Sequence, residues 1–123
     1  MTVPILQLGD YLIASIQTAL ADTEVTELRE SVVERVRRVR ARGVIVDVTG
    51  LDIIDSFAAR ALRSVVKAAS LCGTETAIVG IRPDVAAAMV QFELDLRPLH
   101  TAPDLGEGLA LLDERTNTMR DAR

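Results

Sequence analysis

The sequence has few of the residues that form redox, metal or base-stacking sites. Among 123 residues there are one cysteine (Cys72), one histidine (His100) and no tryptophan. A single cysteine excludes an internal disulfide and any zinc site made of several cysteines. Aromatic residues make up 2% of the chain, too few for a surface that stacks nucleic-acid bases. We expect no metal and no cofactor, with Cys72 filling apolar space near a helix end and His100 in a structural or surface position.

Long apolar runs and excess positive charge are also missing. No segment approaches the roughly 20 apolar residues of a membrane-spanning helix, and the start, MTVPILQLGD, lacks the features of a secretory signal. The formal net charge of −4 argues against nucleic-acid binding driven by counterion release. The basic run ERVRRVRAR follows acids of the same predicted helix, so we interpret it as a solvated face. These features predict a cytoplasmic protein that binds neither nucleic acid nor membrane.

Known catalytic motifs are absent as well. Ser56 does not lie in a G-x-S-x-G turn, and no glycine-rich nucleotide-binding loop occurs. The three aspartates Asp47, Asp52 and Asp55 are close in sequence, but their spacing differs from that of a calcium-binding loop. We therefore predict a protein that is not an enzyme.

The apolar pattern predicts an α/β fold in the order ββαβαβαβα, a mixed sheet of about five strands with about four helices. The elements are expected at 5–8, 11–16, 22–42, 43–48, 56–72, 75–81, 83–94, 96–102 and 105–115. Gly9-Asp10 suits a type II′ hairpin turn, and we expect Asp22 or Thr23 to cap the first helix, with Gly43 ending it. We expect residues 1–115 to form a single domain and 116–123 a polar C-terminal tail.

The segment LDIIDSFAARAL, residues 51–62, places a carboxylate and a hydroxyl between a buried strand and a helix. In one interpretation Ser56 is the N-cap of that helix, where its oxygen would contribute about 1 kcal/mol. In the other, Ser56 accepts a phosphate, because the unpaired N–H groups and the dipole at a helix N-terminus tolerate added negative charge. The residues alone leave both interpretations open.

Three features are similar to those of one known family: the hairpin, the segment VIVDVTGLDIIDS and the segment TAIVGIRPDVAAAM. Through these features, residues 3–115 resemble the STAS domain, the fold of bacterial anti-sigma-factor antagonists. The signature D-x-T-G-x-x-x-x-D-S ends here at Ser56, so the resemblance implies that Ser56 carries the regulatory phosphate. Asp52, Asp55, Phe57, Arg60 and Arg63 are the implied candidates for partner contacts.

Departures from the family pattern favour one of its branches. Simple antagonists read D-S-S-G at this turn, whereas this chain reads DSFAAR, which is more similar to the RsbS-like stressosome proteins. The resemblance implies a scaffold that associates with RsbR-like paralogues and with itself, as a dimer within a large complex. It also implies that an RsbT-like kinase is sequestered, supplies the ATP and Mg²⁺, and leaves after phosphorylating Ser56. The alternatives are a simple antagonist with one partner and a small ligand-binding STAS domain.

Overall fold

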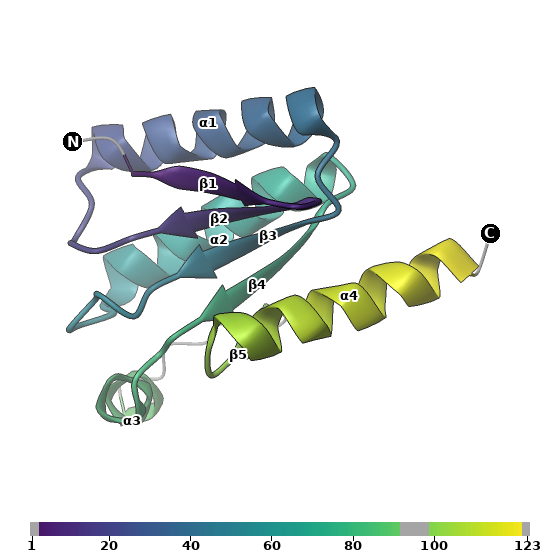
Figure 1. The fold of residues 1–123 in the computed structure, drawn as a ribbon. Coiled ribbons are helices and arrows are strands. Elements are labelled where there is room, and N and C mark those ends of the chain that lie inside the picture. The colour runs from purple at the N-terminus through teal and green to yellow at the C-terminus, as the bar shows by residue number, and fades with distance from the viewer. Residues whose placement is uncertain (1–2, 92–98, 122–123) are drawn as a thin grey trace.

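The computed structural model describes residues 3–91 and 99–121, which form five strands and four helices (Figure 1). In chain order they are β1 (Ile5–Leu8), β2 (Tyr11–Ser15), α1 (Asp22–Val39), β3 (Gly43–Asp47), α2 (Ser56–Leu71), β4 (Glu75–Val79), α3 (Pro83–Gln91), β5 (His100–Ala102) and α4 (Leu105–Asp121). This order confirms the predicted α/β fold and its succession of elements. The expected end of the third helix near Leu94 and the start of the last strand at 96–98 lie outside the described residues.

The strands form one mixed sheet in the order β1-β2-β3-β4-β5. β1 and β2 are antiparallel and joined at Gly9-Asp10, where Gly9 has a φ of 58° that favours glycine. The pairs from β2 to β5 are parallel. Parallel neighbours need long crossover connections, and α1, α2 and α3 lie in these connections. All carboxyl ends of the parallel strands therefore meet at one edge of the sheet.

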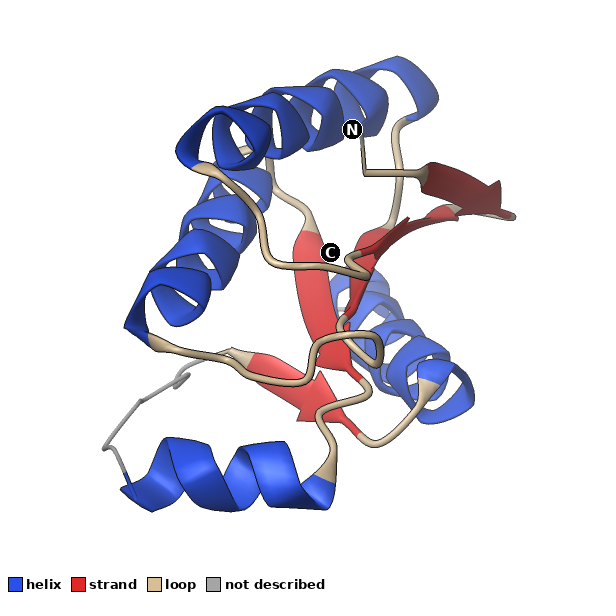
Figure 2. Ribbon diagram, turned by 90° about the vertical axis from the view of Figure 1, so that its left-hand side faces the viewer, coloured by secondary structure: helices blue, strands red, loops and turns tan. Residues whose placement is uncertain are grey.

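Helices cover both faces of the sheet (Figure 2). In β3, Val44 and Val46 pack in the cluster formed with α1 and α2, whereas Ile45 packs in the cluster formed with α4, and all three are fully buried. Because side chains alternate along a strand, the continuous apolar run of β3 fits a central strand covered on both sides. None of the helices in the described ranges has the length and apolarity to cross a membrane.

The ends of α1 differ from those expected. Its N-cap is Ala21, and the Glu24 side chain accepts a 3.0 Å hydrogen bond from the Ala21 N–H. This hydrogen bond lowers the pKa of Glu24. The start of α1 is thus bonded by a carboxylate from within the helix. The expected caps Asp22 and Thr23 are instead the first two residues of the helix. The helix ends with Arg40 in a left-handed conformation, φ 53°, rather than at Gly43. Gly43 instead opens β3, where an added Cβ would lie 2.9 Å from Leu112.

Arg42 ties α4 to the rest of the fold. Its Nη2 donates 2.7 Å hydrogen bonds to Thr116 Oγ1 and Asn117 Oδ1 and lies 3.4 Å from Asp113. The Tyr11 hydroxyl donates to Asp113 at 2.5 Å, and the Arg42 guanidinium lies over the Tyr11 ring. α4 continues to Asp121, past Thr116 where we placed the start of a polar tail, and Thr116 is buried. Thr116 and Asn117 suggested a tail because their partner, Arg42, is distant in sequence.

Candidate functional site

The Asp55-Ser56 turn follows the carboxyl end of β3 and begins α2. Asp55 is the N-cap, and its Oδ1 accepts a 2.8 Å hydrogen bond from the backbone N–H of Ala58. Ser56 is the first residue of the helix. The expectation that Ser56 caps the helix is therefore wrong: the extended backbone at Asp55, φ −88° and ψ −175°, gives the capping position to the carboxylate.

The Ser56 side chain is exposed, and within the described part of the chain its hydroxyl makes no hydrogen bond. It lies at the positive end of the α2 dipole. Since Asp55 supplies the cap, the Ser56 hydroxyl is left exposed to solvent.

Acidic residues surround this hydroxyl. Ser56 shares a shallow hollow with Asp52, Asp55 and Asp84, the last from the first turn of α3. Arg82 partly offsets them: its Nη2 lies 2.9 Å from Asp52 Oδ1, and its Nε lies 3.9 Å from Asp84. The sequence analysis did not assign Arg82 and Asp84 to this site. Their position directly after β4 could have indicated it, because the ends of neighbouring parallel strands lie side by side.

The first half of the D-x-T-G-x-x-x-x-D-S signature holds the backbone in place. Asp47 Oδ1 accepts hydrogen bonds from the N–H and the hydroxyl of Thr49, at 2.9 and 2.6 Å. An added Cβ at Gly50 would lie 2.9 Å from the Cα of Gln17, and one at Gly80 would lie 2.0 Å from Thr49 Oγ1. The connection after β3 is thus packed closely against the chain that follows β2 and β4.

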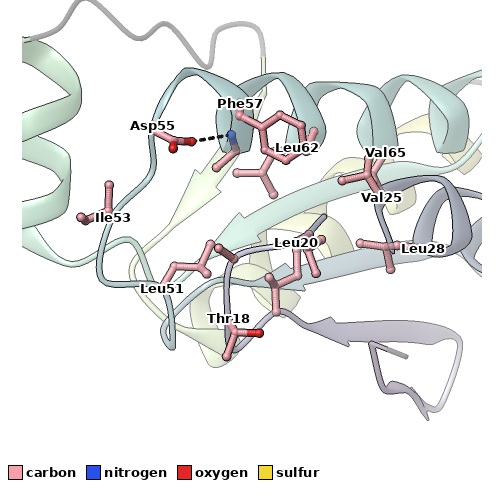
Figure 3. Close-up of a pocket in the computed structure, with 14 residues that line it drawn as sticks. Thr18, Leu20, Val25, Leu28, Leu51, Ile53, Asp55, Phe57, Leu62 and Val65 are labelled. Carbon is pink, nitrogen blue, oxygen red and sulfur yellow. Dashed lines mark hydrogen bonds between the residues drawn. The ribbon is translucent and has the colours of Figure 1, made fainter. Parts of the chain in front are cut away.

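The candidate partner residues fall on more than one surface. Asp52, Asp55 and Arg60 are exposed, Arg63 is half-buried, and Phe57 is 36% exposed. Phe57 and Asp55 line an apolar pocket between α1 and α2 (Figure 3). Ile53, 73% exposed, lines both this pocket and the hollow beside Ser56 and was not among the residues predicted from the sequence.

Three aspartates of the signature and its turn each have a partner other than the Ser56 hydroxyl. Asp47 holds Thr49, Asp52 pairs with Arg82, and Asp55 caps α2. Within residues 3–91 and 99–121, no three His, Cys, Asp or Glu side chains are grouped as metal ligands.

His100 and Cys72 lie away from the turn. His100 begins β5, and its Nε2 is 3.2 Å from Glu75 Oε2 at the start of β4, whereas Ser56 follows the opposite, carboxyl end of β3. Cys72 is exposed at the C-cap of α2, so the expectation that it fills apolar space is wrong. Near this end of α2, the fully buried Ala69 packs in the core instead.

Residues 3–108 match the model of the STAS domain family. The RsbT co-antagonist protein RsbRD of Bacillus subtilis (strain 168) is 32% identical over 99 residues, which cover 80% of this chain. They cover only 34% of RsbRD, so the chain spans about a third of the length of that relative.

Two solved structures match nearly the whole fold. A serine-to-glutamate variant of Moorella thermoacetica RsbS is 31% identical, with a TM-score of 0.77, covering 94% of this chain and 97% of that one. A chain from a structure of the stressosome, described as a signal integration and transduction hub, is also 31% identical, with a TM-score of 0.74. The match covers 90% of this chain and 96% of the stressosome chain.

Proposed function

This chain belongs to the STAS domain family, and we propose that it is a non-catalytic, cytoplasmic stressosome scaffold that sequesters an RsbT-like serine/threonine kinase. Phosphorylation of Ser56 by that kinase releases it. The observation that carries the proposal is the exposed Ser56 hydroxyl at the first position of α2, beside a carboxylate that already caps the helix. The similarity to RsbS over almost the entire chain supports the scaffold role.

The acidic surroundings of Ser56 supply the physical basis for release. A phosphoserine adds about 1.5 to 2 negative charges at neutral pH. These charges would join Asp52, Asp55 and Asp84 around one hollow, where Arg82 pairs with Asp52 and Asp84. The surface changes from weakly to strongly acidic, so a partner placed against it is repelled. The proposed contact surface comprises Asp52, Asp55, Phe57, Arg60 and Arg63.

The decisive experiment is phosphorylation in vitro. The purified chain is incubated with an RsbT-like kinase and ATP, and its intact mass and phosphopeptides are measured. We expect one phosphate, on Ser56, and none on the Ser56→Ala variant. Ser64 is the matched internal comparison, because its hydroxyl accepts a 2.7 Å hydrogen bond from Arg29 and is only partly exposed. Phosphate on Ser64 with none on Ser56 would contradict the proposal.

The size of the complexes that the chain forms distinguishes a scaffold from a simple antagonist. We propose that the chain self-associates, with a dimer as the building unit, and that it joins RsbR-like paralogues in a much larger particle. RsbRD and the stressosome chain are the relatives that support this partner choice. Light scattering after mixing with an RsbR-like protein should give a particle far above the mass of a dimer. A one-to-one complex with the kinase and no large particle would favour the simple antagonist.

A further inference from the structure

The apolar pocket between α1 and α2 has the form of a ligand site. It has a volume of about 240 Å³ and receives side chains from α1, α2 and the connections after β2 and β3. Apolar cavities of about 150 Å³ already bind benzene or xenon. The pocket lies beyond the carboxyl ends of the parallel strands β2 and β3. Its size is therefore that of a small-molecule site.

The two ends of the pocket differ in polarity (Figure 3). At one end Val25, Leu28 and Val65 are at most 8% exposed, so a ligand there would contact only hydrocarbon. Toward the other end lies the exposed carboxylate of Asp55, and the hydroxyl of Thr18 also lines the pocket. The pocket thus fits an elongated molecule with an apolar body and one polar head.

The charges at the open end select the kind of head group. The Asp55 cap uses one hydrogen bond to Oδ1, and an ionised carboxylate has about four acceptor sites in all. A donor can therefore still bind Asp55 without displacing the cap. Asp52 and Asp84 lie in the adjoining hollow, which shares Asp55 and Ile53 with the pocket. Arg82 offsets only part of the charge of these three aspartates, so an anionic head would still meet net negative charge.

We propose that this pocket binds a small amphiphilic amine, with its hydrocarbon between α1 and α2 and its ammonium group at Asp55. The proposal is independent of any kinase, because it concerns the apolar pocket and not the Ser56 hydroxyl. A bound amine would nevertheless contact Asp55 and Phe57, the two residues on either side of Ser56.

The test is a titration of the ¹⁵N-labelled chain with octylamine, 1-octanol and octanoate, followed by two-dimensional NMR. The three probes share their hydrocarbon and differ in head-group charge. We expect saturable shifts confined to the pocket, with octylamine binding about two- to fivefold tighter than 1-octanol because Asp55 is solvent-exposed. Octanoate should bind weakest. Hexylamine should bind about tenfold more weakly than octylamine, since each buried methylene contributes substantially to affinity.

Substitutions distinguish octylamine binding in the pocket from nonspecific attraction to the surface. Ala61→Leu fills the pocket from α2 and should weaken octylamine binding about tenfold. Ala68→Leu, the same change on the same helix outside this pocket, should not. Ala58→Leu fills the pocket from the preceding turn and replaces Ala61→Leu if the latter fails to fold. Asp55→Asn keeps a capping oxygen and should remove the preference for octylamine over 1-octanol.

Three results would overturn the proposal. The first is a set of shifts that do not saturate or that scatter over the surface, which would mean weak adsorption only. The second is octanoate binding as tightly as octylamine. The third is undiminished octylamine binding by a folded pocket-filling variant.

Discussion

The Asp55 carboxylate caps α2 by accepting a 2.8 Å hydrogen bond from the Ala58 N–H, and so frees the neighbouring hydroxyl of Ser56 from a structural role. Ser56→Ala should therefore change the free energy of unfolding by less than about 0.5 kcal/mol, as is usual for a surface substitution. Asp55→Ala should lower it by about 1 kcal/mol, whereas Asp55→Asn, which keeps the cap, should not. Urea denaturation of the three variants measures this. A larger loss for Ser56→Ala than for Asp55→Ala would assign the cap to the serine.

A negative charge at position 56 should weaken kinase binding without lowering the stability of the fold. Ser56→Asp places a carboxylate in the first turn of α2, where the helix dipole favours it, so the variant should fold at least as well as the wild type. Binding of the RsbT-like kinase should weaken by about 1–3 kcal/mol if the added charge faces a desolvated contact, while Ser56→Ala should still bind. Calorimetric titration measures both. Ser70→Asp, an exposed position near the other end of α2, controls for added charge. Equal binding by all variants would leave Ser56 without a regulatory role.

Gly80 and Gly73 provide a matched pair for the packing around Thr49. Both have positive φ, 86° and 79°, but only at Gly80 would a Cβ collide with Thr49, at 2.0 Å. Gly73→Ala should cost about 1–2 kcal/mol for the left-handed backbone. Gly80→Ala should cost about 3 kcal/mol or more, because overpacking is added to the same backbone strain. Thermal and urea unfolding provide the comparison. Equal losses of unfolding free energy in the two variants would mean that the close contact between residue 80 and Thr49 does not affect stability.

Tyr11 should make the fold sensitive to alkaline pH. Burial, followed by the hydrogen bond to Asp113, raises the pKa of Tyr11 above its ordinary 10.0. A phenol whose folded pKa is raised stabilises the fold fully below the unfolded pKa and loses that contribution as pH rises through the folded value. The free energy of unfolding should therefore fall as the pH rises above 10, and less steeply in Tyr11→Phe.

Tyr11 is the only tyrosine in the chain, so ultraviolet absorbance during a pH titration reports its ionisation directly. An apparent pKa at or below 10.0 in the folded protein would contradict the expected shift. Identical slopes of stability against pH for the wild type and Tyr11→Phe would show that the tyrosine does not contribute to alkaline unfolding.

The sequence by itself determined the order of strands and helices and the turn that carries Ser56. These features are local: the apolar run of β3, the helical spacing of Leu62, Val65 and Ala69, and Pro83 at the start of α3 depend on neighbouring residues. Periodicity and turn chemistry encode such features within a short window. The cap of α4 is equally local: Asp104 stands directly before the helix, and its Oδ1 accepts a 2.9 Å hydrogen bond from the Glu107 N–H.

Only the tertiary structure decided which residues act together. The choice of Asp55 over Ser56 as the cap depends on backbone angles that two adjacent capping residues do not specify. Arg82 reaches Asp52 across 30 positions, and Arg42 reaches Thr116 across 74. The pocket between α1 and α2 likewise needs the parallel register that brings the ends of β2 and β3 together. These contacts join segments far apart in the chain, and no local pattern encodes their distance or direction.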